Sequence, residues 1–133
     1  MRSIVQRTTF LLLLCAAPLA GCAKPDHEKA IRQRAQELIG FMCADDVEGC
    51  VRLTDPLFVR AQGTEGVKLR FKLLNAIVKL GKLGPDKVRI DQVAVAQDAK
   101  SAQVTISVLA DKQWKSLQPT RWVLSDGKWY LAF

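Results

Sequence analysis

The chain has 133 residues, of which 49% are hydrophobic and 25% charged, and its formal net charge is +7. This length provides one folded domain and excludes two full domains. The basic excess suits a protein held against anionic lipid headgroups, and it is equally consistent with simple solubility.

The first 21 residues have the pattern of an export signal. Arg2 and Arg7 give a basic start, and an apolar run from Phe10 to Ala17 follows. The run is far short of the roughly 20 apolar residues that cross a bilayer. Residues 1–21 are therefore expected to form a signal peptide that is removed, not a permanent helix.

Residues 19–22, with the sequence Leu-Ala-Gly-Cys, end this segment. They resemble the bacterial lipobox, in which the cysteine sulfur is joined to diacylglycerol and a dedicated peptidase cuts just before it. The resemblance implies a lipid on Cys22 and, because Ala23 follows it, attachment at the outer membrane facing the periplasm. An ordinary secretory signal with a chance cysteine is the alternative. We expect a lipidated tether over residues 22–26 and a single α+β domain over residues 27–133.

A first helix is expected from the N-cap Asp26 to about Cys43, because apolar residues recur there at helical spacing. A turn over residues 44–46 then leads into a short second helix that ends near Leu53. The apolar positions of the first helix are Ile31, Ala35, Leu38, Ile39 and Met42.

Cys43 and Cys50 flank this turn as an even pair in a chain that is expected to enter an oxidising compartment. We therefore expect a disulfide between them. Two free buried thiols are the alternative. A zinc site is not expected, because two sulfurs and the distant His27 do not make a set of four ligands.

After a break at residues 54–56 and a short segment over residues 57–61, a longer helix is expected from about Thr64 to Lys82. Its main apolar stripe consists of Val67, Phe71, Leu74, Ile77 and Val78. Four leucines widen the stripe, namely Leu69, Leu73, Leu80 and Leu83. This width predicts a helix buried over more than one side. The basic remainder of the helix is expected to be solvated, and nucleic acid is not an expected partner of an exported chain.

From Lys87 onward the hydrophobic period changes from near four to two, which predicts strands over residues 87–97 and 102–110. A turn at residues 98–101 joins them, and a bulge near residues 91–92 keeps the apolar residues on one face. The expected partners are Val95 with Val104 and Val93 with Ile106.

A polar connection over residues 111–118 carries Trp114, and a hairpin closes the chain. Its turn, Asp126-Gly127, is a preferred two-residue turn. The expected partners are Leu124 with Trp129 and Trp122 with Leu131. The opposite face of this hairpin is mostly polar and includes Tyr130.

Helices followed by a four-stranded antiparallel meander indicate an α+β domain with N-terminal helices packed on a curved sheet. Three stretches resemble, in this order, the nuclear transport factor two-like, cone-shaped fold of the cystatin-like kind: residues 43–46 after the first helix, residues 55–58, and residues 122–131. That family includes isomerases, dehydratases, ligand-binding modules and domains without known activity, so the fold alone does not give the function.

No catalytic residue, metal site or cofactor is predicted. Family members that resemble steroid isomerases use acids and a tyrosine inside the cone, whereas Tyr130 falls on the polar face. We expect a non-enzymatic lipoprotein of the cell envelope, bound to the membrane through its lipid, whose cone-shaped domain binds a partner protein or a small apolar ligand. Trp114 and Tyr130 are the expected contact residues. The alternatives are a small isomerase- or hydrolase-like enzyme and an envelope inhibitor or immunity protein.

Overall fold

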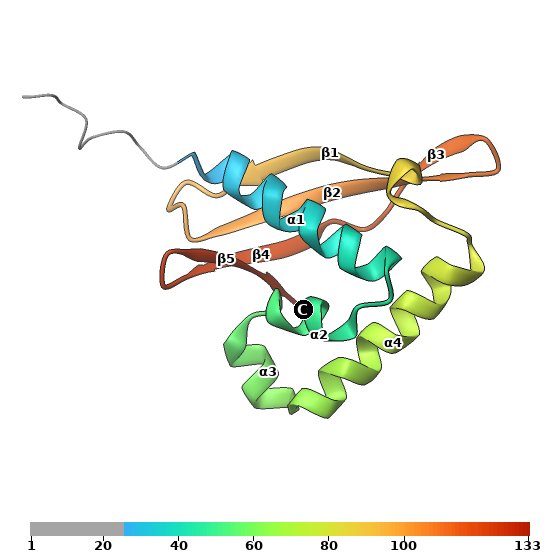
Figure 1. The fold of residues 1–133 in the computed structure, drawn as a ribbon. Coiled ribbons are helices and arrows are strands. Elements are labelled where there is room, and N and C mark those ends of the chain that lie inside the picture. Colours follow the sequence, from blue (N-terminus) through green and yellow to red (C-terminus); the bar gives the residue numbers. More distant parts are fainter. Residues whose placement is uncertain (1–25) are drawn as a thin grey trace, which may run out of the picture.

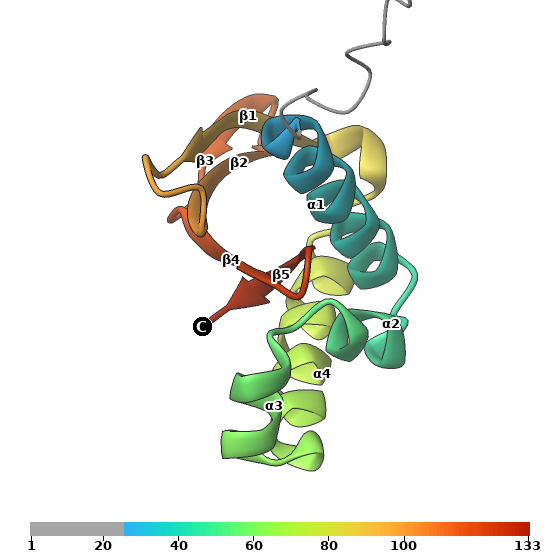
Figure 2. The ribbon, with the colours of Figure 1, turned by 90° about the vertical axis from the view of Figure 1, so that its left-hand side faces the viewer.

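A computed structural model of the chain describes residues 26–133, so the expected signal peptide, the lipobox and Cys22 lie outside the described residues. Four α-helices come first, and a five-stranded antiparallel sheet follows (Figure 1). Seen along the molecule, the strands form an arc and α1 (His27–Cys43) lies across its open side (Figure 2). The expected α+β architecture, with helices packed on a curved sheet, is confirmed.

Aspartates fix the starts of three helices. The carboxylates of Asp26, Asp46 and Asp55 accept hydrogen bonds from backbone N–H groups of the first turns of α1, α2 and α3. These bonds satisfy donors that have no partner inside a helix, so the chain starts a helix at each site. The helices after α1 are α2 (Val47–Arg52), α3 (Pro56–Gln62) and α4 (Thr64–Leu80).

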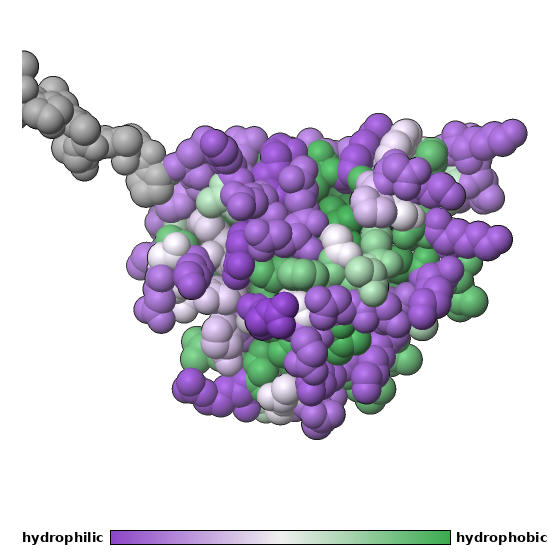
Figure 3. Space-filling view, viewed as in Figure 1, coloured by the Kyte–Doolittle hydropathy of each residue, from purple (hydrophilic) through white to green (hydrophobic). Residues whose placement is uncertain are grey.

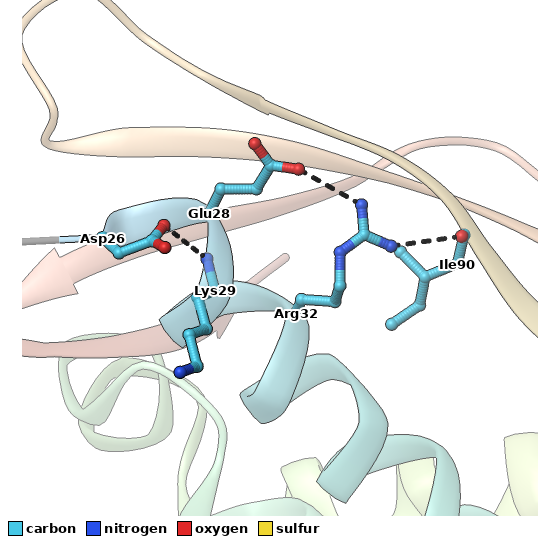
Figure 4. A network of polar contacts seen from close by, with 5 residues as sticks. All are labelled: Asp26, Glu28, Lys29, Arg32 and Ile90. Atoms are coloured by element: carbon cyan, nitrogen blue, oxygen red, sulfur yellow. Dashed lines mark hydrogen bonds and ion pairs between the residues drawn. The ribbon is translucent and has the colours of Figure 1, made fainter.

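The start of α1 is also joined to the sheet. Arg32 forms an ion pair with Glu28 at 3.3 Å and donates a hydrogen bond to the backbone carbonyl of Ile90 at 3.4 Å (Figure 4). One guanidinium thus links the first turn of α1 to the strand beneath it.

The sheet has one strand more than expected. After the short 3-10 helix η1 (Pro85–Lys87) come β1 (Val88–Val95), β2 (Ser101–Ala110), β3 (Gln113–Ser116), β4 (Thr120–Ser125) and β5 (Lys128–Ala132). The order is β1-β2-β4-β5, and β3 pairs with the second half of β2. The predicted four-stranded meander with a polar connection was wrong, because Asp111 and Lys112 take positive φ values of 52° and 62° and reverse the chain. Trp114 therefore lies in a strand, opposite Leu109.

The closing hairpin has the predicted register, with Trp122 opposite Leu131 and Leu124 opposite Trp129. The predicted bulge is also confirmed, because the pairing of β1 and β2 shifts between Ile90 and Gln92. The predicted partners in β1 and β2 were wrong by two residues. The structure pairs Val95 with Ala102 and Val93 with Val104. The connection between β1 and β2 occupies residues 96–100 instead of the predicted residues 98–101. Because the register differs by an even number of residues, every side chain stays on the predicted face of the sheet.

The concave side of the sheet is filled by side chains of the chain itself. Trp122, Phe71 and Ile31 are fully buried there. The remaining members of this core are Ala35, Leu38, Cys50, Leu53, Val67, Ala102, Val104, Trp129 and Leu131. Fully burying one large apolar side chain contributes about 1.5–3 kcal/mol, so this filling stabilises the cone from inside.

Helix α4 is buried on one side only. It contributes Val67, Phe71 and Asn75 to the interior. The leucines that were predicted to widen its buried face include Leu69 and Leu73, which are 58% and 61% exposed. The prediction of burial over more than one side was wrong. Helices α1, α2 and α3 contact α4, but no described element covers the outer face, which carries Leu69 and Leu73.

Candidate functional site: a basic groove beside β5

A groove of about 730 Å³ opens between α1, α2, α3 and β5. Its apolar lining includes Phe41, Val51, Leu53 and Val59. Its cationic lining consists of Arg34, Arg52, Arg60 and Lys128, and we call this site the basic groove. Glu37 is the carboxylate among its lining residues, and Tyr130 is the tyrosine.

The groove exists because the edge of β5 is covered by the turn between α2 and α3. The N–H of Leu131 donates to the carbonyl of Leu53 at 2.8 Å, and the N–H of Asp55 donates to the carbonyl of Leu131 at 2.8 Å. These bonds close part of an exposed sheet edge. They also hold α2 and α3 beside β5, with the groove between them.

Arg34 is fixed at one wall by three contacts. Its Nε donates to the carbonyl of Trp129 at 2.9 Å, and its guanidinium carbon lies 5.3 Å from the ring centre of Tyr130. Its Nη1 lies 3.6 Å from a carboxylate oxygen of Glu37. A guanidinium held over an aromatic face in this way is a cation–π contact. Arg34 therefore orients Tyr130 and shares its charge with Glu37.

The other three cations are exposed and lack a carboxylate partner. Arg52 lies over the ring of Phe41, with its guanidinium carbon 5.8 Å from the ring centre. Among residues 26–133, no carboxylate oxygen lies within 4.0 Å of the charged groups of Arg52, Arg60 or Lys128. The groove thus has an excess of positive charge above an apolar floor, which favours an anion that also carries apolar surface.

The two predicted contact residues lie apart. Tyr130 lines the basic groove, whereas Trp114 lies on β3 at the other end of the sheet (Figure 1). Trp114 is 39% exposed and packs under the guanidinium of Arg89 at 4.4 Å. His27 packs edge-on against the ring of Trp129, with 5.5 Å between ring centres, and does not line the groove.

Cys43 and Cys50 are free thiols, so the predicted disulfide is absent from the structure. The reason is their placement: Cys50 is fully buried in the core, whereas Cys43 lines a separate cavity of about 240 Å³ at the end of α1. Burial, assisted by the charge of Asp46, raises the pKa of Cys50 to about 11. Burial and the charge of Asp86 also raise the pKa of Cys43. Both shifts disfavour the thiolate, which is the reactive form.

A second polar cluster lies at the bulge of β1. The Asp91 carboxylate accepts hydrogen bonds from Ser107 and from Arg89. Both bonds lower the pKa of Asp91, and the bond from the Ser107 hydroxyl has the larger effect. Because Ser107 is only 3% exposed, this cluster fixes the bulge and does not present a hydroxyl to a ligand.

Over the same described residues, no group of three or more histidine, cysteine, aspartate or glutamate side chains could hold a metal ion. No helix of residues 26–133 is long and apolar enough to cross a membrane.

The fold is that of nuclear transport factor two-like (NTF2-like) domains. No protein-family model matches the sequence, and no curated protein is similar to it. The crystal structure of a chain provisionally named an NTF2-like transpeptidase, from Campylobacter jejuni, is similar over 76% of this chain and 95% of that one, with 17% identity and a TM-score of 0.58. A second solved chain, an NTF2 variant with five substitutions in its name, matches over 77% of this chain and 90% of its own, with 14% identity and a TM-score of 0.49.

Proposed function

We propose that this chain is a binding protein of the cell envelope whose basic groove holds an anionic ligand with an apolar part. The observation that carries the proposal is the set of cations without carboxylate partners, Arg52, Arg60 and Lys128, around an apolar floor. An anionic headgroup would lie among them, because guanidinium groups bind carboxylates and phosphates through paired hydrogen bonds. The apolar part would cover Phe41 and its neighbours. The groove is separate from the hydrophobic core, which fills the concave side of the sheet.

The envelope location rests on the lipobox pattern at residues 19–22. A lipid on Cys22 would hold the protein at a membrane, where anionic amphiphiles are concentrated. Cys22→Ser is expected to release the protein into the soluble fraction or to leave the signal uncleaved. Unchanged membrane partition with normal processing would refute the anchor.

The protonation of the two described thiols supports a role in binding and not in catalysis. A transpeptidase, as the Campylobacter chain is provisionally named, transfers an acyl group and commonly uses an activated nucleophile. Here the raised pKa values keep Cys43 and Cys50 protonated. The likeness to that chain concerns the fold, so its name does not carry over to this protein.

Calorimetric titration of the purified full chain with decanoate, and with uncharged decanol as the matched probe, tests the groove. We expect saturable binding of decanoate at one site and much weaker binding of decanol. The double variant Arg52→Gln with Arg60→Gln is expected to weaken decanoate binding by at least about tenfold, because each substitution removes a charged partner of the decanoate carboxylate. Arg121→Gln, an exposed arginine of β4 outside the groove, is the control.

Equal binding of decanoate and decanol would refute an anion site. So would decanoate binding that the double variant leaves unchanged. Native mass spectrometry of protein isolated from the envelope then identifies the natural ligand, which we expect to be anionic and lost in the same double variant.

A further inference from the structure

The outer face of α4 carries a continuous apolar stripe. It consists of Leu69, Leu73, Ile77 and Leu80, which are 58%, 61%, 63% and 85% exposed. Their spacing of four, four and three residues places them on one side of the helix. Figure 3 shows apolar surface along the lower right edge of the molecule, where α4 lies. We call these four residues the α4 stripe.

Scattered exposed leucines are ordinary on protein surfaces, but an aligned stripe of four along one helix marks an interaction site. The other side of α4 holds Val67, Phe71 and Asn75 in the core. Helix α4 therefore has two apolar faces. One packs in the core, and the opposite one is exposed. Fold stability accounts for the first face and not for the second.

Basic residues border the α4 stripe on both sides. Arg70 and Lys72 are exposed, and within residues 26–133 neither has a carboxylate oxygen within 4.0 Å of its charged group. Arg70 instead lies over the ring of Phe133 at 4.6 Å. Two further lysines of α4 do have acidic partners, since Lys68 contacts Glu48 at 2.9 Å and Lys79 contacts Asp45 at 3.1 Å. The unbalanced charge thus lies next to Leu69 and Leu73.

We propose that the α4 stripe docks an amphipathic helix of a partner protein that carries acidic residues beside its own apolar face. Two helices pack with their side-chain ridges interdigitated, and a straight stripe of 17-residue α4 offers such a ridge. Glutamate or aspartate on the partner would pair with Arg70 and Lys72 at the rim. The apolar residues of both helices would be removed from water.

A second copy of this chain fits the stripe poorly. Pairing α4 with itself would bring Arg70 and Lys72 of each copy toward the same residues of the other, and like charges across an interface are costly. Charge complementarity therefore favours an acidic partner over self-association.

The membrane that would hold the lipid anchor fits the stripe poorly as well. The start of α1, where the described chain begins, lies at the opposite end of the molecule from the outer face of α4 (Figures 1 and 3). Residues 23–26 extend at most about 14 Å, whereas α1 alone, with 17 residues, is about 25 Å long. A lipid on Cys22 would thus leave the α4 stripe directed away from that membrane, toward soluble partners.

Fluorescence anisotropy with synthetic peptides tests the proposal on the purified full chain. The probe is a labelled helical peptide with leucine at its heptad a and d positions and glutamate beside them. Its controls are the same peptide with lysine in place of glutamate and a scrambled peptide of the same composition. We expect saturable binding of the acidic helix alone, weakened by high salt because the rim charges are screened.

Three variants locate the contact. Leu73→Gln is expected to weaken binding of the acidic peptide by at least about tenfold, because it removes an apolar anchor. Leu117→Gln, at a 48% exposed leucine outside α4, is the matched control and should change the affinity less than twofold. Lys72→Glu should weaken binding of the acidic peptide and strengthen binding of the lysine peptide. A general loss of structure would weaken both.

Several outcomes would overturn the proposal: equal binding of the scrambled or lysine peptide, no peptide binding, or no effect of Leu73→Gln. Self-association without peptide that Leu73→Gln abolishes would assign the stripe to a second copy. Binding to phosphatidylglycerol vesicles that depends on Leu73, with no binding of the acidic peptide, would assign it to a lipid surface. Arg52→Gln with Arg60→Gln should leave peptide binding unchanged, so failure here is distinguishable from failure of the basic groove.

Discussion

Replacing Phe71 with alanine tests how α4 packs on the core. Phe71 is fully buried, and its ring meets the ring of Phe133 edge-on with 5.7 Å between centres. Removing such a side chain costs about 3–5 kcal/mol, from lost burial and the cavity that remains. Leu73→Ala, two residues along the same helix, is the matched control. Because Leu73 is 61% exposed, its replacement should cost less than about 1 kcal/mol.

Urea unfolding followed by circular dichroism measures both variants. A lower midpoint with an unchanged slope reports a loss of stability without a change in the surface exposed on unfolding. Similar costs for Phe71→Ala and Leu73→Ala would refute the orientation of α4. A larger cost for Leu73→Ala would place the α4 stripe in the core and remove the basis of the docking proposal.

Three further predictions concern the packing of α1, α2 and α4. Gly49→Ala should destabilise by about 1–3 kcal/mol, since the new Cβ would lie 2.6 Å from the ring of Phe41, whereas Gly40→Ala, with nothing within 4 Å, should stabilise by up to about 1 kcal/mol; equal thermal midpoints for the two would contradict this packing. Iodoacetamide without reductant should label Cys43 slowly in the native protein and Cys50 only after unfolding, because Cys50 is fully buried; two thiols that stay unlabelled in denaturant would restore the disulfide. The Asp45 carboxylate has a pKa lowered by hydrogen bonds from a lysine and an asparagine of α4, so its stabilisation is present above its unfolded pKa of about 3.9 and is lost as the pH falls through the folded pKa. Wild type and Asp45→Asn should therefore differ in thermal midpoint at pH 6 and converge toward pH 2, and a constant difference would refute the assignment.

Local signals explain what could be predicted from the sequence. Asp126 and Gly127 both take positive φ, 49° and 76°, and a two-residue turn of this kind fixes the register of its hairpin. Aspartate before a helical pattern identified the start of α1 correctly, because the cap bond is made within three residues. The bulge in β1 followed from a break in the apolar alternation.

What the sequence missed depended on tertiary structure. The turn at Asp111 and Lys112 contains no glycine, so its positive φ values gave no signal and β3 was taken for a connection. Arg34 and Lys128 lie near opposite ends of the described chain, and each looked like one polar residue on a solvated face. They line one groove only because α1 and β5 lie side by side, and no local spacing announces that contact.

The wrong predictions for the two thiols and for the outer leucines of α4 have the same cause. Helical spacing shows which residues share a face, but not which faces find a neighbour. Cys43 and Cys50 flank a turn, yet α2 directs Cys50 into the core. Leu69 continues a predicted apolar stripe, yet the side of α4 on which it lies has no described element against it.

The most direct test of the central claim is a two-dimensional amide NMR titration of the purified full chain with decanoate, below the concentration at which decanoate forms micelles. We expect saturable shifts grouped around Phe41, Arg52, Arg60 and Tyr130, and their loss in the double variant Arg52→Gln with Arg60→Gln. Shifts that group on the outer face of α4 or spread evenly over the sheet would contradict the claim that the basic groove is the binding site, as would the absence of any saturable shift.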